Sequence, residues 1–436
     1  MKGQAKEQVN VQGKGQAKEQ GKNVRAESGA KSGSGGRGKG KGKRKQNYKK
    51  YFSFLYLIIF GVLTFIFITN DFGLLDLRKT SVIIGVALDY EEEEVVLTAQ
   101  LAIPQPAENG ENTKFNVVTG RGQSVASALH EVNVKTGYYP KLDFCKLIIL
   151  GETCFSQNII KFLDYFYRNE YSGLRMSVAS CEGKAGELIS QEFPCGNSAT
   201  DVIDKVLSQE AQSSANVCSV SLKDVGEKLW SKSKGVFMPY LQNGILVEEP
   251  SGGGDSGGSG GSGSSGHCEE SELTCNCAAI FSDGNFKGIL NEEQNFALAL
   301  LNNEVKHTFL DSGNGGDKRV IGLRSCKGGV KVSIEEGTPV LKFQFSAKVK
   351  LQDSDKGFSP EELKNPGVSK QILSEGEDDI NRLFISLYEF CKERECDILG
   401  IKNRLYKKSK AYFKQYEDSI FSSLTVTGDV KLKSFT

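Results

Sequence analysis

The sequence lacks the signatures of the common enzyme classes. It has no G-x-S-x-G motif and no catalytic Cys-His signature, and none of its three histidines stands in an H-E-x-x-H pattern. Tryptophan occurs once, at Trp230. Nothing in the sequence therefore favours catalysis. The single tryptophan also gives little support to a deep binding pocket lined with aromatic side chains.

The first fifty residues have few apolar and few acidic side chains. They carry a net charge of +12, whereas residues 51–436 carry a net charge of −11. The segment KGQAKEQ occurs twice, at residues 2–8 and 14–20. Because such a chain cannot bury enough apolar surface to offset its ordering entropy, we expect a disordered basic cytoplasmic tail over residues 1–50. Its basic end suits anionic lipid headgroups. No aromatic residue interleaves with the basic ones before Tyr48, so the pattern does not favour binding to nucleic acid.

Residues 51–70 lack charged side chains altogether. Thirteen of them are Phe, Leu, Ile or Val, and a helix of this length spans about 30 Å, the thickness of the hydrocarbon core of a bilayer. At about −0.3 to −0.6 kcal/mol each, these residues favour insertion by about −4 to −8 kcal/mol. Since Lys and Arg are concentrated before the run, the sequence predicts a transmembrane signal anchor with the N-terminus in the cytoplasm and the later residues outside.

A cleaved leader fits this segment poorly. The residues ITNDFG after the run offer no A-x-A cleavage site, and the first cysteine is Cys145, so no lipid-attachment box follows. A buried core helix would be shorter or would carry a polar face. We therefore interpret residues 51–70 as an uncleaved anchor.

The residues after the apolar run alternate between strand and helix patterns. SVIIGVALDY and VVLTAQLAI, separated by EEEE, predict a hairpin, and KLIILGE and MSVASCEG predict buried strands. QSVASALHEV and KAGELIS have helical spacing, and QNIIKFLDYFYRN places Ile160, Leu163, Phe166 and Tyr167 on one helical face. This order predicts an α+β fold of mixed β-sheets packed with helices.

The C-terminal part shows the clearest periodicity. Phe343, Phe345, Ala347, Val349 and Leu351 alternate along one predicted strand, and SSLTVTGDVKLKS predicts another through Leu424, Val426, Val430 and Leu432. Between them a helix is expected from Ser369 to about Glu395, with an apolar stripe at Ile380, Leu383, Phe384, Leu387 and Cys391. We expect three exterior domains, at residues 74–195, 196–325 and 326–436. The second contains the Gly/Ser insertion 251–266.

Four potential metal ligands lie close together in HCEESELTCNC. These are His267, Cys268, Cys275 and Cys277, whose spacing is not that of a common zinc module. A zinc site, a disulfide and free thiols all remain open for this cluster. The chain holds 11 cysteines, an odd number, so at least one is unpaired unless chains are cross-linked.

The segment TGRGQS resembles a glycine turn that cradles phosphate. Gly120 and Gly122 precede a predicted helix, but the third glycine and the lysine of stronger signatures are missing. An ordinary helix start capped by Ser124 is the better account.

In this order the segments resemble the Ger(x)C family, the C subunits of spore germinant receptors, from about Leu77 to Lys433. The hairpin SVIIGVALDY…VVLTAQLAIPQP, the stretch VVTGRGQSVASALHEV…KLIILGE and FYRNEYSGLRMSVAS are similar to the family's first half. CAAIFSDGNFKGIL and ECDILGIKNRLYKKSKAYFK are similar to its second half, and in the last of these Gly400 would end the long helix, Leu399 pack back and Asp397 cap a turn. The positions that match family motifs are Asp89, Gly120, Gly122, Gly151, Glu152, Arg168, Phe281, Gly288, Leu290, Asp397, Leu399 and Gly400.

The resemblance implies a non-catalytic exterior protein without cofactors. Such subunits act with an A-type and a B-type membrane subunit in the inner membrane of the spore and trigger germination in response to nutrients. Family members usually carry a lipid anchor, which the helix at residues 51–70 would replace here. The alternatives from other classes are a membrane-anchored solute-binding or cell-wall-binding protein, which requires a deep pocket, and a wall hydrolase, which requires paired carboxylates or a metal.

Overall fold

The chain divides by its internal contacts into two units, residues 1–74 and residues 75–436. The computed structural model describes residues 44–69, 80–102, 115–193, 198–208, 215, 217–244, 272–303, 305–312, 319–354 and 367–435. The greater part of the predicted basic tail, the Gly/Ser segment 251–266, His267 and Cys268 lie outside these residues.

The first unit contains one described helix, α1 (Arg44–Thr69). It includes nearly all of the uncharged run, and its large apolar side chains from Tyr51 to Phe67 are exposed. The predicted membrane span ends at Asn70, which is not among the described residues. Within the described part of the chain, no helix combines the length and the apolar character that crossing a membrane requires. The membrane span therefore stays a proposal.

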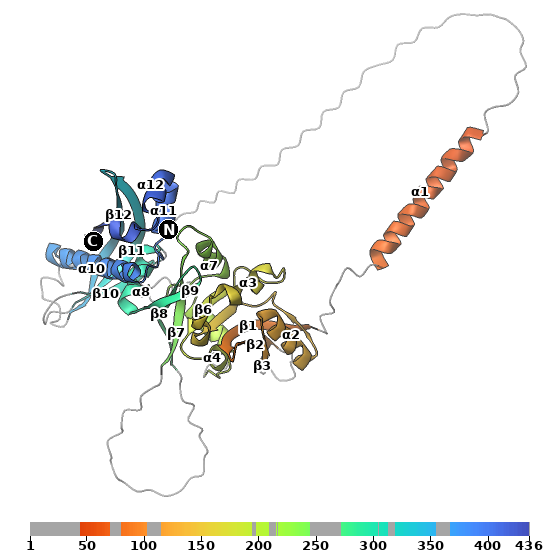
Figure 1. The fold of residues 1–436 in the computed structure, drawn as a ribbon, viewed down its shortest axis with the longest axis horizontal. Helices are drawn as coiled ribbons and strands as arrows, with labels where there is room; N and C mark the ends of the chain where they lie inside the picture. Colours follow the sequence, from red (N-terminus) through yellow and green to blue (C-terminus); the bar gives the residue numbers. More distant parts are fainter. Residues whose placement is uncertain are drawn as a thin grey trace, which may run out of the picture. The chain divides into compact units, whose positions relative to one another are not determined.

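The second unit contains a nine-stranded mixed sheet with the strand order β3-β2-β1-β5-β6-β7-β8-β9, in which β4 also pairs with β1 (Figure 1). The pairs from β1 through β5 and β6 to β7 are parallel, and the outer pairs are antiparallel. The strands are β1 (Thr80–Glu91), β2 (Glu94–Ala102), β3 (Phe115–Gly122), β4 (Tyr139–Lys141), β5 (Leu147–Gly151), β6 (Ser177–Cys181), β7 (Gly235–Gly244), β8 (Glu272–Ser282) and β9 (Asn285–Leu290).

The hairpin predicted for β1 and β2 is confirmed, and β8 and β9 form a second hairpin. The β1–β2 turn places Glu92 and Glu93 at φ of 50° and 66°, and the β8–β9 turn places Asp283 and Gly284 at φ of 50° and 79°. Two-residue turns with positive φ at both positions match the right-handed twist of the strands that they join. Local turn chemistry thus sets the register of both hairpins.

Helices cover both faces of the nine-stranded sheet. β5 is buried on both sides, with Ile148 and Leu150 in one apolar cluster and Leu147 and Ile149 in another. This double burial explains why β5 reads as a continuous apolar run. The first cluster includes residues of α2 (Val125–Thr136), α3 (Ile160–Arg168) and α7 (Leu222–Leu229), and the second includes residues of α4 (Ala185–Ile189) and α5 (Ala199–Val206).

The buried face of α3 differs from the prediction. Phe162, Leu163 and Phe166 are fully buried, whereas Ile160 and Tyr167 are only partly covered. All four predicted residues contact the apolar core, but the prediction omitted Phe162, because periodicity alone does not show which apolar side chains of a helix are buried most deeply.

A second, four-stranded sheet has the order β10-β11-β12-β13. The alternation predicted for β12 is confirmed, since Phe343, Phe345, Ala347 and Val349 are all at most 5% exposed. β10 and β11 were not predicted. The elements are β10 (His307–Ser312), β11 (Arg319–Glu335), β12 (Thr338–Ser354) and β13 (Thr425–Ser434), with α8 (Glu292–Leu301), α10 (Lys370–Glu393), α11 (Ile401–Lys408), α12 (Lys410–Tyr416) and α13 (Ile420–Ser423).

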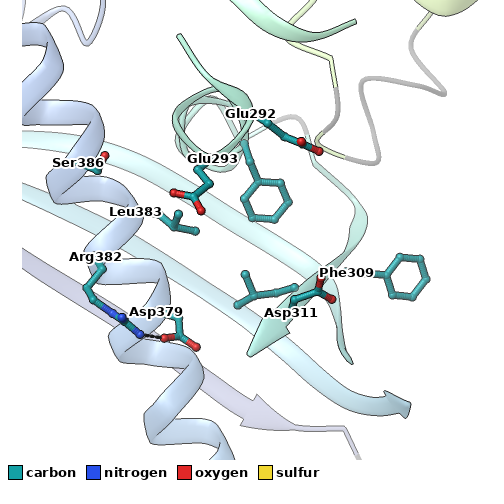
Figure 2. A pocket seen from close by; sticks show the side chains of 10 residues that line it. Glu292, Glu293, Phe309, Asp311, Asp379, Arg382, Leu383 and Ser386 are labelled. Atoms are coloured by element: carbon teal, nitrogen blue, oxygen red, sulfur yellow. Dashed lines mark hydrogen bonds and ion pairs between the residues drawn. The ribbon is translucent and has the colours of Figure 1, made fainter. Parts of the chain in front are cut away.

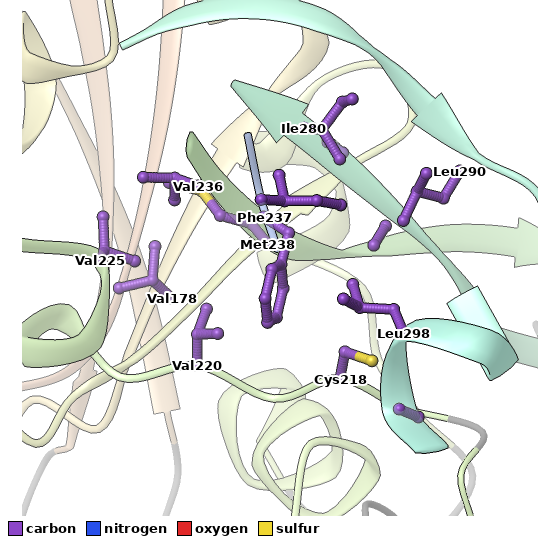
Figure 3. Close-up of a cluster of buried hydrophobic side chains, with 14 of the residues drawn as sticks. Val178, Cys218, Val220, Val225, Val236, Phe237, Met238, Ile280, Leu290 and Leu298 are labelled. Carbon is purple, nitrogen blue, oxygen red and sulfur yellow. The ribbon is translucent and has the colours of Figure 1, made fainter. Parts of the chain in front are cut away.

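The two sheets share one apolar core, which includes Val178 of β6 and Phe343 of β12. Figure 3 shows part of it, with Phe237 of β7, Ile280 of β8 and Leu298 of α8 in one cluster. β6 and β7 lie on either side of residue 195 and pair directly. Strands from the first two predicted domains therefore belong to one sheet, and the division into three exterior domains stays a prediction.

The predicted extent of the long helix is confirmed, but the role predicted for Gly400 was wrong. α10 begins after the N-cap Ser369 and ends at Glu393, close to the expected Glu395, so Gly400 does not end it. Gly400 instead stands before α11 with φ of 71°. A glycine with positive φ is as compatible with the start of one helix as with the end of another, which is why the sequence alone misplaced it.

The α10 core contact gives a prediction. Phe384 is fully buried, with its ring centroid 5.5 Å from Phe343 and 6.1 Å from Phe345. We expect Phe384→Ala to lower the free energy of unfolding by about 3–5 kcal/mol, because it leaves a cavity. Ile385 is 46% exposed, so Ile385→Ala is the control and should change it by less than about 1 kcal/mol. Urea denaturation followed by circular dichroism measures both, and equal losses would contradict this packing.

Candidate functional site

Asp397, one of the family-motif positions, is a buried helix cap. Its side chain accepts hydrogen bonds from the backbone N–H groups of Ile401 at 2.8 Å and Lys402 at 2.7 Å, the first two residues of α11. Gly400, the N-cap residue, has no side chain with which to do this. The predicted capping role of Asp397 is confirmed, and Leu399 is buried beside it as expected.

The turn at Asp397 connects the C-terminal part of the larger unit to β7 of the nine-stranded sheet. A Cβ on Gly235, the first residue of β7, would lie 2.2 Å from the carbonyl oxygen of Asp397. Asn403 N–H donates to the Ser233 hydroxyl at 3.0 Å. A cavity of about 260 Å³ adjoins this contact. Glycine at position 235 therefore allows the backbone of the turn to lie directly against β7.

Asp89 has the same role at the other end of the larger unit. It lies on β1, is 2% exposed, and accepts from the backbone N–H groups of Ala185 at 2.9 Å and Gly186 at 2.8 Å, at the start of α4. The N-cap residue Lys184 makes no side-chain cap. Thr153 donates a further hydrogen bond at 3.2 Å. A strand residue almost a hundred positions away thus caps this short helix.

Burial opposes the charge on both carboxyl groups. Desolvation raises the pKa of Asp89 and of Asp397 above the ordinary value, while the hydrogen bonds to each act in the opposite direction. Both residues therefore serve as capping groups inside the fold.

The paired glycines of TGRGQS do not form a phosphate-binding turn. Gly120 and Gly122 lie within β3, and a Cβ on Gly120 would be 2.2 Å from the carbonyl oxygen of Ala128 in α2. Ser124 caps α2 and forms a capping box with Ser127, which confirms the expected helix start. The glycines are needed because the helix packs closely on the strand.

The remaining motif positions also contribute to packing. Phe281 and Leu290 are fully buried, and a Cβ on Gly288 would approach Phe390 of α10 at 3.2 Å. A Cβ on Gly151 would lie 2.0 Å from Asp89 Oδ1. Glu152 accepts from the Tyr240 hydroxyl and from Gly183 N–H. Arg168 alone is exposed, in an ion pair with Asp164.

The cysteines form no bonded pair among the described residues. Cys275 is buried, Cys277 is half-buried, and both are free, as are Cys391 and Cys396. Burial raises the pKa of Cys275 to about 12, so its thiol stays protonated and unreactive at neutral pH. No group of three or more His, Cys, Asp or Glu side chains in the described ranges is placed to hold a metal. His267 and Cys268, the proposed partners of Cys275 and Cys277, lie outside those ranges.

An acidic groove of about 770 Å³ lies between α8, β10 and α10 (Figure 2). Its floor is apolar, with Phe296, Leu310 and Leu383, and its polar rim consists of Glu292, Glu293, Asp311, Asp379 and Arg382. Asp379 is held in place by an ion pair with Arg382 and by the Ser312 hydroxyl, which donates to it at 2.6 Å.

The groove has the composition of a docking surface rather than a catalytic site. It combines an apolar floor with four carboxylates and a single cation, so it suits a partner segment with apolar and basic side chains. Of its residues, only Leu383 was named from the sequence, as part of the apolar stripe of α10, and none was named as a binding residue. The available signal was Phe309, an aromatic residue at an outward position of a strand that alternates exposed and buried residues.

Comparisons with known proteins place the chain in one family. A family model described as a spore germination protein N-terminal domain matches residues 75–243, and one described as spore germination B3/GerAC like, C-terminal, matches residues 276–434. A crystal structure of the GerBC protein aligns with 81% of this chain and 97% of its own, at 16% identity and a TM-score of 0.46. No curated protein matches the sequence.

The Asp397 cap gives a second prediction. Asp397→Ala leaves two buried N–H groups without acceptors, so we expect the free energy of unfolding to fall by about 2–4 kcal/mol. Ser221, which caps α7 near the surface, provides the control. Ser221→Ala should cost only about 1 kcal/mol. Chemical denaturation of both variants measures the difference, and equal losses would show that burial of the Asp397 cap adds nothing.

Proposed function

The chain belongs to the Ger(x)C family of spore germination proteins, and from this we propose that it acts as the non-catalytic C subunit of a nutrient-germinant receptor. In this role it works by protein–protein contact with an A-type and a B-type membrane subunit in the inner membrane of the spore. Contact with these partners transmits or stabilises their nutrient-bound state and so triggers germination.

The observation that supports this proposal most is the pair of family matches. They follow one another in order, from residue 75 to residue 434, and the Gly/Ser segment 251–266 falls in the interval between them. That segment joins β7 to β8, which pair antiparallel. The insertion therefore extends a hairpin connection and leaves both matched parts intact.

The structural roles of the motif residues also support a function in protein–protein contact. Asp89, Asp397 and the glycines beside them fix helices to strands inside the fold, and the groove between α8, β10 and α10 has an apolar floor and an acidic rim. A rigid scaffold that presents such a surface suits a subunit that binds other proteins.

The test in the organism is a deletion of the gene, with spores exposed to nutrients and, separately, to a trigger that is not a nutrient. We expect the response to nutrients to be lost and the response to the other trigger to be kept, because only the first passes through the receptor. Complementation with the unaltered chain is the control. Normal germination by nutrients in the deletion strain, with no second receptor of the family present, would contradict the proposal.

We also propose that residues 51–70 attach the chain to the membrane. The support is the sequence itself, which has no charge over this run and has Arg44, Lys45, Lys49 and Lys50 just before it.

The attachment is tested by washing spore membranes with alkaline carbonate. We expect the unaltered chain to stay with the membranes, because a helix of twenty uncharged and mostly apolar residues is held far more firmly than a peripheral protein. A matched variant that begins at residue 75 should be released. Release of the unaltered chain under the same wash would contradict attachment through this segment.

A further inference from the structure

β10 has one open edge. It is the outermost strand of its sheet and pairs only with β11. The Lys306 carbonyl accepts from Ser325 N–H at 3.0 Å, which marks the hydrogen-bonded pairs of this antiparallel ladder. Because such pairs alternate, His307, Phe309 and Asp311 direct their backbone N–H and C=O groups away from β11. In the part of the chain that the structure describes, no group pairs with them.

Two other outer strands have their edges covered by a helix. At β3, Lys135 of α2 donates to the Thr119 carbonyl at 2.8 Å, and Arg121 N–H donates to Glu131 of the same helix. At β13, Leu432 N–H donates to Glu377 of α10 at 2.7 Å. Exposed lysines on β13, at positions 431 and 433, further discourage pairing. β10 has no such protection among the described residues and instead exposes Phe309, which is 59% accessible.

A groove lies on each face of the sheet beside this edge. On the helix side is the acidic groove, with four carboxylates and one arginine over an apolar floor. On the open side is a hollow of about 460 Å³ that contains Lys306, His307 and Arg324 and no acidic residue. Phe309 contributes to both, and Figure 2 shows it turned away from α10. A strand added to β10 would therefore place successive side chains in surroundings of opposite charge.

We propose that β10 is a docking edge that takes up an extended segment of a partner protein as an additional strand. The segment has basic and apolar side chains on the face that meets the acidic groove. On the other face it has acidic or small polar side chains, which meet Lys306 and Arg324. Backbone hydrogen bonds to His307, Phe309 and Asp311 supply affinity, and the two grooves supply specificity. The identity of the partner as a receptor subunit rests on the proposed function. The proposal of a docking edge rests only on β10 and the two grooves beside it.

The probe is an eight-residue peptide that repeats Lys, Glu, Val and Thr twice, so that lysine and valine share one face. Binding to the full-length chain in detergent is followed by fluorescence anisotropy and by amide hydrogen exchange. We expect the amides of His307, Phe309 and Asp311 to exchange rapidly in the free chain and to become protected when the peptide binds. A peptide with glutamate in place of each lysine should bind at least tenfold more weakly.

Backbone pairing is tested with two methylated peptides. One carries N-methyl groups on lysine and valine, and the other carries them on glutamate and threonine. Since only alternate residues of an added strand face β10, one methylated peptide should lose at least tenfold in binding and the other should not. Equal binding by both methylated peptides would overturn the proposal, as would protection at other amides alone.

Variants of the chain supply the matched control. Asp311→Pro removes an outward N–H and leaves the β11 ladder intact, so we expect it to weaken peptide binding at least tenfold. Asp311→Ala keeps the N–H and removes only one groove carboxylate, so it should weaken binding clearly less than Asp311→Pro does. Equal effects of the two variants, with unchanged circular dichroism, would overturn pairing at this edge. Peptide binding together with normal nutrient germination in the deletion strain would support the docking edge and contradict the role in a receptor.

Discussion

The larger unit depends on two buried carboxylates that cap the helices α4 and α11, whose own N-cap residues provide no side-chain cap. A helix start leaves backbone N–H groups without partners, and inside a core such groups must be satisfied. At α4 the N-cap residue is Lys184, and at α11 it is Gly400, and neither provides a side-chain cap. Asp89 and Asp397 supply the acceptors instead. The cap of α4 comes from β1, so folding of the strand and placement of the helix are coupled.

In this arrangement each buried aspartate has a glycine packed against it. Gly151 leaves room for the Asp89 carboxylate, and Gly235 allows the Asp397 turn to lie against β7. The Asp397 contact also joins elements from the two family matches, since Gly235 belongs to the first and Asp397 to the second. The motif positions therefore stabilise the scaffold. The surfaces suited to partners, the acidic groove and the edge of β10, lie elsewhere.

Features set by neighbouring residues were predictable from the sequence. The two hairpins, α2 with its Ser124 cap, the Ser369 start of α10 and the alternation along β12 follow from local periodicity and turn chemistry. The cap by Asp397 was also predictable, because its acceptor and donors lie within five residues of one another. The cap by Asp89 was not, because its donors are almost a hundred residues away. Gly120 was ambiguous, since a turn and close contact with a helix both require glycine. β10 was missed because it is short and half of its residues are exposed.

In the proposed role this chain acts within a receptor, by contact with an A-type and a B-type membrane subunit. The most direct measurement is purification of the chain from dormant spores after mild cross-linking, with quantitative mass spectrometry of the proteins that accompany it. We expect both membrane subunits to be recovered in a fixed ratio to the chain and to be absent from a parallel purification of an unrelated spore membrane protein. Recovery of neither subunit would contradict the proposed role.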